Sequence, residues 1–423
     1  MFMLSQTSPT DWKYLSEGGA TAVFSYRGHP HPILTGKVLR LRKTSSQAGG
    51  RPIDIDIPEP AVTFQQNIIS RLVDPTYLVD LQIVPLETHW VETFSLHHEL
   101  SRPPERRSTS TIDNSKRTAV LASDLVGGIP CAVEVKPKWG FLPNPTHLSP
   151  ESKPIKTRTC RTCMHTHLKQ TEGNNVAVHY CPLDLFSGSR ERLEIALEGL
   201  WNSWTQSNGA INNLRIFHYG KMVLPTDELG LQVWSQETLS LPPDAPITSI
   251  KSKFISALLP LFLHNSLLQH ISALQRSLDP LDCEGFAKLV ESKRIQSAGS
   301  SDSINAALPI ADLTQPTMDD WTSFVDIFLS QERQKHSSFS PSNLRYHTLA
   351  YLLSASFKDC SLIVPIRSQT DVTEMDGIKV IDLDIKVVDR IPGWSKLDKK
   401  IVREYAKIDT GLRKTCTEVS SGT

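Results

Sequence analysis

Three short segments of this chain alternate apolar and charged residues, and this pattern constrains the fold more than any other feature of the sequence. The charged positions are Arg40 and Arg42, then Lys136 and Lys138, then Asp382, Asp384 and Lys386. Successive residues of a strand point to opposite faces, so each segment predicts a strand with one charged face. A single segment of this kind is typical of a solvated sheet face. Three in one chain indicate a shared polar cleft that holds several cations and a few carboxylates.

Hydrophobic periodicity predicts a strand-rich first part of about 120 residues, followed by a mixture of helices and strands. The expected strands include Thr21–Tyr26, Pro32–Arg42, Cys131–Val135 and Ile378–Lys386. The expected helices include Arg190–Trp204, capped by Ser189, and a long region over Phe254–Leu278 that is broken or kinked at Pro260. These elements place the chain in the α+β class.

The charges balance over the whole chain but not along it. There are 45 basic and 45 acidic residues, which excludes a protein that coats a polyanion. Residues 134–170 nevertheless carry seven Lys or Arg against two Glu, and residues 386–414 carry nine against four acidic residues. Such basic segments suit a small, highly anionic ligand held by charge-assisted hydrogen bonds. Carboxylates beside it repel the ligand unless a metal such as Mg²⁺ bridges them to phosphates, which points to phosphoryl transfer.

The cysteines and the N-terminus indicate a reduced, intracellular protein. Seven cysteines, an odd number, do not read as a disulfide framework. Met1–Thr10 has neither the basic nor the apolar region of a secretory signal. The most apolar stretch, Ala257–Leu263, is far shorter than the ~18 residues that a membrane span needs.

Two weaker motifs allow other interpretations. Glu17-Gly-Gly-Ala20 lies between β-prone runs and could cover nucleotide phosphates, although it matches no established phosphate-loop pattern. Cys160-x-x-Cys163, with two histidines and Cys181 downstream, could form a zinc-dependent interaction module. A structural zinc site needs four ligands, and no second pair follows at finger-like spacing.

Several longer motifs occur in one order along nearly the whole chain. They are Glu134-Val-Lys-Pro-Lys-Trp-Gly-Phe-Leu-Pro143, Arg161–Lys169, Tyr180–Gly188, Asn212–Arg215, Lys358–Ser361, Asp382–Lys386 and Leu397–Lys400. Together they resemble the inositol-pentakisphosphate 2-kinase family. The resemblance implies a bilobal kinase-like fold that binds ATP between a strand-rich N-lobe (1–125) and a larger mixed α/β C-lobe (126–423) with an inositide-binding insertion.

The implied activity is ATP-dependent phosphorylation of the 2-hydroxyl of inositol pentakisphosphate, which gives the hexakisphosphate, phytate. The alternative is a non-catalytic inositol-phosphate-binding protein of the same fold. Lys136, Asp359 and Asp382 argue against that alternative, because binding alone needs neither carboxylate.

By the same resemblance, individual positions acquire expected roles. The nucleotide-binding residues are Gly18, Gly19, Ala20, Arg40, Ser123, Asp124, Leu125, Asn212, Asn213 and Arg215. The inositide-binding residues are Arg106, Lys136, Lys138, Lys169, Lys386 and Arg390, with Trp394 where plant members have an aromatic hydroxyl. Asp382 holds Mg²⁺. Asp359 orients or deprotonates the 2-hydroxyl, and it is a second candidate metal ligand; Lys136 also lies close to the γ-phosphate.

The resemblance also sets expectations about cofactors and partners. Plant and animal members have a Cys/His zinc cluster in the insertion before the Lys-Asp-Cys motif. The corresponding stretch here, Asp279–Tyr346, has one cysteine and one histidine, so ATP and Mg²⁺ are expected and zinc is not. We expect a monomer in the nucleus or cytoplasm that requires neither nucleic acid nor a membrane.

Overall fold

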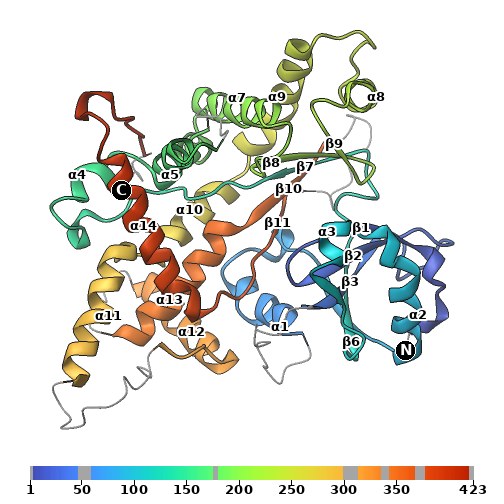
Figure 1. Ribbon diagram of the computed structural model, residues 1–423, viewed down its shortest axis with the longest axis horizontal. Coiled ribbons are helices and arrows are strands. Elements are labelled where there is room, and N and C mark those ends of the chain that lie inside the picture. The colour runs from blue at the N-terminus through green and yellow to red at the C-terminus, as the bar shows by residue number, and fades with distance from the viewer. Residues whose placement is uncertain are drawn as a thin grey trace. The chain divides into compact units, whose positions relative to one another are not determined.

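The structure, a computed structural model, describes residues 3–45, 59–174, 180–298, 313–334, 343–366 and 377–418. It is a mixed α+β fold (Figure 1) with two β-sheets and many helices. The chain divides into two compact units, which are described separately. The first unit comprises Met1–Ala132, Ile216–Val223 and Pro365–Lys379, and the second comprises Val133–Arg215, Leu224–Val364 and Val380–Thr423.

The first unit contains a six-stranded antiparallel sheet of order β1-β2-β3-β6-β4, with β5 paired to β3. Its strands are β1 (Trp12–Glu17), β2 (Thr21–Tyr26), β3 (Lys37–Ser45), β4 (Leu81–Pro85), β5 (Ser110–Ile112) and β6 (Thr118–Ser123). Its helices are α1 (Pro60–Asn67), α2 (Thr88–His98) and α3 (Pro104–Arg107). The strand predicted from Pro32 begins only at Lys37, because residues before it form a turn that closes at Gly36 with φ +74°.

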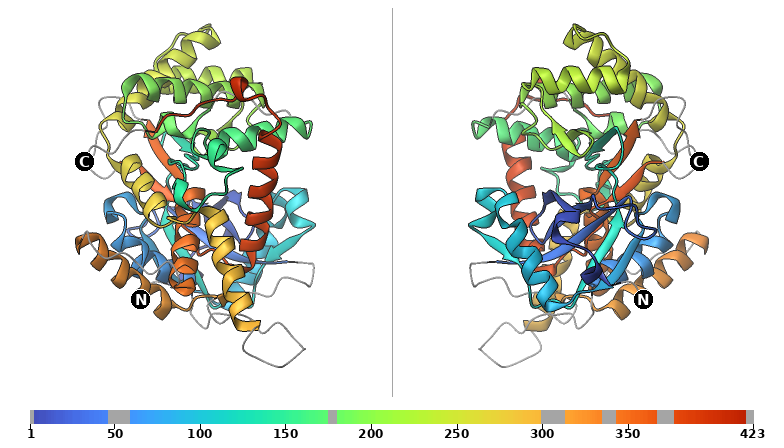
Figure 2. Two further views of the ribbon diagram at one scale, coloured as in Figure 1. Left: turned by 90° about the vertical axis from the view of Figure 1, so that its left-hand side faces the viewer. Right: turned by 90° about the vertical axis from the view of Figure 1, so that its right-hand side faces the viewer.

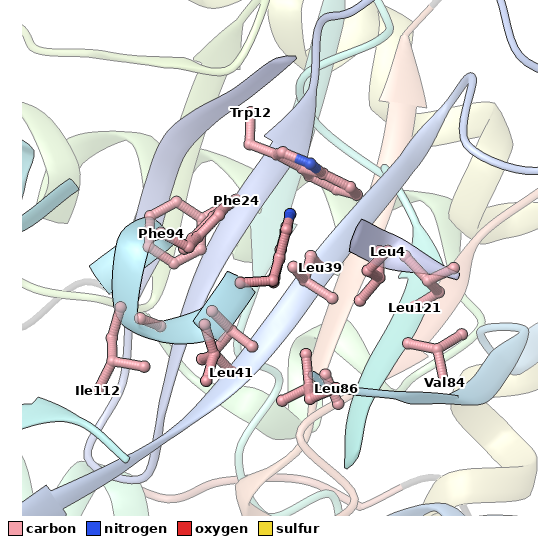
Figure 3. Close-up of a cluster of buried hydrophobic side chains, with 14 of the residues drawn as sticks. Leu4, Trp12, Phe24, Leu39, Leu41, Val84, Leu86, Phe94, Ile112 and Leu121 are labelled. Atoms are coloured by element: carbon pink, nitrogen blue, oxygen red, sulfur yellow. The ribbon is translucent and has the colours of Figure 1, made fainter. Parts of the chain in front are cut away.

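One face of this sheet carries the core of the first unit (Figure 3). Phe24, Leu39 and Leu41 are buried with Phe94 of α2, and the rings of Phe24 and Phe94 meet edge to face at 4.8 Å. Burying each such side chain contributes roughly 1.5–3 kcal/mol. The alternation predicted for β3 is confirmed, because Leu39 and Leu41 are buried whereas Arg40 is only half-buried.

The second sheet has the order β11-β10-β7-β8-β9, and β8 pairs with β9 in antiparallel fashion. Its strands are β7 (Cys131–Val135), β8 (Leu214–His218), β9 (Lys221–Val223), β10 (Ser361–Ile366) and β11 (Lys379–Ile381). The helices of the second unit are α4 (Lys153–Lys156), α5 (Arg161–Thr171), α6 (Pro182–Leu185), α7 (Arg190–Gln206), α8 (Glu228–Leu239), α9 (Ile247–Leu263), α10 (Leu267–Ser277), α11 (Asp282–Ala298), α12 (Met318–Gln334), α13 (Leu344–Asp359) and α14 (Ile391–Tyr405).

Two predicted helices have different outcomes. The helix over Arg190–Trp204 is confirmed as α7, and the Ser189 hydroxyl accepts a hydrogen bond from the Arg192 N–H as its cap. Of the break or kink predicted at Pro260, the break is wrong, because α9 continues through this residue to Leu263. The chain turns instead at Asn265, whose side-chain oxygen accepts from the N–H of Leu267. α7 and α9 lie side by side (Figure 2), with the rings of Trp201 and Phe254 5.0 Å apart.

The strand predicted over Ile378–Lys386 is also wrong beyond Ile381. Asp382 has φ +62°, a left-handed conformation that Asp tolerates better than most residues and that ends a strand. The alternation of Asp382, Asp384 and Lys386 therefore does not place them on one strand face.

The described residues include no single helix with both the length and the apolar composition of a membrane span. One bent pair of helices meets these criteria only when its two members are taken together.

Candidate active site

The second unit brings its predicted site residues to the ends of β7, β10 and β11. Lys136 directly follows β7, and its N–H donates to the carbonyl of Asn213 beside β8 at 3.0 Å. Two residues further on, Lys138 has φ +64°, and Asp382 just beyond β11 has φ +62°. Left-handed backbone at residues other than glycine is strained and is concentrated at functional positions. The chain therefore changes direction within three residues of the end of β7 and directly after β11.

Asp382 lies at the centre of one polar cluster. Lys136 donates from Nζ to Asp382 Oδ2 at 3.3 Å, and the Ser361 hydroxyl lies 3.2 Å from the same oxygen. The side chain of Asp382 remains 44% exposed. The carboxylate is therefore fixed on one side by a cation and a hydroxyl, and its other side is open to a ligand.

Glu134 extends this cluster into the interior and was not among the predicted site residues. It is buried in β7, where its Oε1 lies 2.9 Å from the Ser361 hydroxyl and its Oε2 lies 3.3 Å from Arg215. The single proton of Ser361 can be donated to Glu134 or to Asp382, but not to both at once. A charged residue inside the apolar run Cys131–Val135 was the signal that could have revealed this position.

Asp359, at the last position of α13, forms a second ion pair with Lys386 at 2.8 Å. Burial alone would raise the pKa of Asp359. The hydrogen bond and charge of Lys386, with the charges of Lys136 and Lys138, outweigh burial and lower the pKa below its ordinary value. Asp359 is therefore a carboxylate at neutral pH. Its side chain is 61% exposed, so a ligand can reach it.

Cations gather around Lys138. Burial, followed by the positive charges of Lys136 and Lys169, lowers the pKa of Lys138, and Asp359 opposes this effect. Burial also lowers the pKa of His165 on α5 to about 4, with further contributions from Lys169, Arg161 and Lys138. The second unit thus brings Lys136 and Lys169 within electrostatic reach of Lys138, as expected for an anion-binding site.

Gln275 of α10 holds the segment around Lys138 in place, and nothing in the sequence pattern had distinguished it. Its side-chain amide donates to the carbonyls of Lys138 and Phe357 at 3.0 and 2.9 Å, and its oxygen accepts from the N–H of Gly140 at 2.7 Å. Gln275 is completely buried. One amide therefore fixes the Lys138 loop relative to the end of α13, which carries Asp359.

Lys358, the neighbour of Asp359, is buried and makes its contacts inside the protein. Its ammonium pairs with the buried Asp279 at 2.5 Å and lies 4.1 Å from the centre of the Trp139 ring. A cation over an aromatic face is stabilised by the ring quadrupole. Lys358 thus ties the Lys-Asp-Cys motif to the Lys-Pro-Lys-Trp motif at the position next to Asp359.

Three further residues predicted for the second unit are placed as follows. Arg390 is exposed at the N-terminus of α14. Trp394, on the next turn, lies with its ring 6.0 Å from that of Tyr351. Asn212 is exposed beside Asn213.

The predicted nucleotide loop and Arg106 lie in the first unit. Gly18, Gly19 and Ala20 form the exposed turn between β1 and β2, where a Cβ on either glycine would meet open space. Arg106 is an exposed residue of the short helix α3.

The predicted hinge is shaped by Asp124. Its N–H donates to the carbonyl of Gly36 at 2.8 Å, and its side chain accepts from the N–H of Gly127 at 2.6 Å. While the Gly36 contact is in place, the N–H of Asp124 cannot also donate to adenine, so a backbone donor from this hinge would have to be another residue.

Comparison with known proteins identifies the group to which these motifs belong. A family model described as inositol-pentakisphosphate 2-kinase matches residues 14–400. The chain belongs to the inositol-pentakisphosphate 2-kinase family. The family match includes every residue described above for the two polar clusters and for the nucleotide loop.

Relatives from fungi and plants are similar over nearly their whole length. The inositol-pentakisphosphate 2-kinase of Cryptococcus neoformans var. neoformans serotype D is 34% identical over 415 residues, 94% of each chain. Those of Oryza sativa subsp. indica and Arabidopsis thaliana are 28% and 27% identical over 456 and 460 residues, at least 95% of each chain.

The expectation of no zinc at Cys160 and Cys163 rested on two grounds: no second ligand pair follows at finger-like spacing, and the two cysteines fall within a motif of the resembled family. The fold nevertheless brings two further cysteines to them, which finger-like spacing does not reveal. Cys181 and Cys416 complete a group of four cysteines whose sulfur atoms lie within 4.8 Å of one another. In the stretch Asp279–Tyr346, where the family's zinc cluster was not expected, residues 299–312 and 335–342 lie outside the described residues. Cys416 also lies outside the family match, so membership of the family does not by itself account for the group of four cysteines.

Proposed function

We propose that this chain transfers the γ-phosphoryl group of ATP to the 2-hydroxyl of inositol pentakisphosphate and so forms the hexakisphosphate. The observation that carries the proposal is the pair of partly exposed carboxylates, Asp359 and Asp382, each held by a lysine within one cationic cluster. Together with the family, this pattern favours phosphoryl transfer, which depends on charge neutralisation and alignment more than on covalent help from the protein.

Asp382 is suited to hold Mg²⁺. Its contacts with Lys136 and Ser361 both use Oδ2, so Oδ1 remains for a hard cation that prefers oxygen ligands. Mg²⁺ in kinases bridges a carboxylate and the transferred phosphates and neutralises their charge. Here the contact with Lys136 orients the Asp382 carboxylate before any metal is bound.

For Asp359 we favour the orientation of the 2-hydroxyl over its deprotonation. A carboxylate whose pKa is lowered by Lys386 is a weak base, although it remains a good hydrogen-bond acceptor. Lys386 holds this acceptor directly, and the ion pair of the neighbouring Lys358 with Asp279 anchors the backbone beside it. A loose transition state for phosphoryl transfer requires little proton removal at the start of the reaction, so a weak base is sufficient.

The first unit supplies the nucleotide residues in this proposal, as the N-lobe of a kinase-like bilobal fold. Arg40 is half-buried on the face of β3 opposite Leu39 and Leu41, where a strand cation could contact ATP phosphates. The turn over Gly18–Ala20 is open enough for its backbone to approach them. In the second unit Arg215, held by Glu134, would complete the phosphate contacts.

The test is a direct assay of the purified chain with ATP, Mg²⁺ and inositol 1,3,4,5,6-pentakisphosphate, with the products resolved by anion exchange. We expect the hexakisphosphate to form with equimolar release of ADP, and no product when Mg²⁺ is omitted. A non-catalytic binding protein would bind the pentakisphosphate in calorimetry without turnover. That result would refute the proposed activity and favour the alternative.

A further inference from the structure

Four cysteines that are far apart in the sequence converge at one place in the second unit. They are Cys160, Cys163, Cys181 and Cys416, and their sulfur atoms all lie within 4.8 Å of one another. Three of the four residues are buried and Cys163 is half-buried. The catalytic proposal uses none of them.

The spacing of the sulfur atoms suits a tetrahedral metal ion. Zinc–thiolate bonds of about 2.3 Å place the sulfur atoms of a tetrahedral site about 3.8 Å apart. The sulfur atoms of Cys160 and Cys181 are 3.9 Å apart. A shift of less than about 1 Å in the remaining sulfur atoms would therefore complete the coordination sphere.

The local backbone prepares two of the ligands. Cys160 is the N-cap of α5, and the N–H of Cys163 donates to the Cys160 sulfur at 3.4 Å. A backbone N–H directed at sulfur stabilises a thiolate more than a neutral thiol. The C-x-x-C spacing at the start of a helix thus forms one half of a four-thiolate site.

The fourth ligand arrives on the C-terminal segment, which is bound to the chain just before Cys160. The N–H of Cys416 donates to the Arg158 carbonyl at 2.7 Å, and the Thr159 hydroxyl donates to the Lys414 carbonyl at 2.6 Å. Lys414, Thr415 and Thr417 are exposed, whereas Cys416 is buried. An otherwise exposed segment thus directs a single side chain inward, to the other three cysteines.

We propose that these four cysteines bind one structural Zn²⁺ as thiolates. Binding releases the thiol protons as four zinc–sulfur bonds form, and no oxidant or reductant is required. The complex carries a charge of −2, and the ammonium of Lys414 lies within electrostatic reach of all four sulfur atoms. The ion would join the C-terminal segment to the start of α5, the helix that carries Lys169.

The experiment measures the metal content of the purified full-length chain by mass spectrometry, in the wild type and in three variants. Cys163→Ser and Cys416→Ser each remove one ligand, and Cys283→Ser is the matched control because Cys283 is buried outside the cluster. We expect one zinc per chain in the wild type and in Cys283→Ser, and a loss of most of the zinc in the two ligand variants.

Cobalt substitution of the wild type provides a second measurement that does not depend on whether the variants fold. Co²⁺ in place of Zn²⁺ should give the intense visible absorption of a tetrahedral thiolate complex, and added Zn²⁺ should abolish it. The proposal is overturned by a metal-free wild type whose four thiols are alkylated in the native state. It is also overturned by disulfides among these cysteines, by iron as the resident metal, or by equal zinc in wild type and ligand variants.

Discussion

At Asp382 a left-handed backbone and a partly exposed carboxylate occur in one residue, and a single substitution separates their contributions. Asparagine tolerates positive φ about as well as aspartate, so Asp382→Asn should leave the fold intact. Because it removes the charge that would hold Mg²⁺, it should lower kcat by roughly a hundredfold or more. Asp384→Asn, at an exposed position two residues away, is the control and should retain activity. Near-normal turnover by folded Asp382→Asn would exclude the metal-binding role.

Gln275 is predicted to matter through the groups that it holds. Gln275→Leu would leave the carbonyls of Lys138 and Phe357 and the N–H of Gly140 buried without their present partner. Each unpaired buried group costs about 1–3 kcal/mol, so we expect a loss of at least ~2 kcal/mol in the free energy of unfolding. Urea denaturation measures this loss. The kcat should also fall, because Lys138 and Asp359 lose their common support.

Gln269→Leu is the matched control for this experiment. It lies on the same helix, α10, at an exposed position, and should change the free energy of unfolding by less than ~0.5 kcal/mol. If both substitutions lowered the free energy of unfolding equally, the loss would come from replacing any glutamine of α10 and not from the Gln275 hydrogen bonds.

Among the elements of the second unit, α4, α5, α11 and α14 meet at a buried ion network. Lys156 of α4 bonds to Asp282 and, at 2.9 Å, to Asp398 of α14, which also pairs with Arg161 of α5 at 2.6 Å. Lys156→Met leaves two buried carboxylates with less compensation, and removing one partner of a buried pair costs about 3–5 kcal/mol. Thermal or urea unfolding should show a loss of this size. Lys153→Met, an exposed position on the same helix, should show almost none.

Helix α2 of the first unit predicts a dependence of stability on pH. Burial lowers the pKa of His98, and the hydrogen bond to the Pro9 carbonyl opposes this effect without cancelling it. The charge of His97 lowers the pKa further. The unfolded state therefore binds a proton more readily than the folded state, so the free energy of unfolding should fall as pH drops below ~6.5, by at most ~1.4 kcal/mol per unit for one group. We expect His98→Gln to reduce the loss measured between pH 7.5 and 5.5. His89→Gln, at an exposed position of the same helix, should retain a slope like that of the wild type.

The elements also show where sequence reasoning was sufficient. Helix α7 follows from periodicity because it buries one apolar stripe, whereas strand β7 follows from a short, mostly apolar run that is buried along its whole length. The strand over Ile378–Lys386 was predicted from the same kind of alternation but ends at Ile381, because Asp382 adopts a positive φ that no periodicity reveals. The motifs named Asp359, Asp382 and their lysines. Gln275 and the link from Cys160 to Cys416 depend on long-range packing, which spacing along the chain does not encode.

For the whole molecule, the uneven distribution of charge predicts that salt affects the binding of the two substrates differently. The chain has no net charge, yet Lys136 and Lys169 lie within electrostatic reach of Lys138 in the second unit, and Arg390 is exposed there. A ligand with five phosphates depends on these charges. As the Debye length falls from ~10 Å at 0.1 M to ~3 Å at 1 M salt, exposed charge interactions weaken. Contacts of adenine with backbone groups and apolar side chains are screened much less.

Raising the salt concentration should therefore increase the KM for inositol pentakisphosphate far more than the KM for ATP. Arg390→Ala should flatten the salt dependence of the inositide KM, because one charge contact is gone. Lys396→Ala, an exposed cation on the same helix, should leave that slope unchanged. Steady-state kinetics at several salt concentrations measure both slopes. If the two substrates respond alike, or if Arg390→Ala retains the wild-type slope, then Arg390 and its neighbouring lysines do not form the inositide site, whatever reaction the chain catalyses.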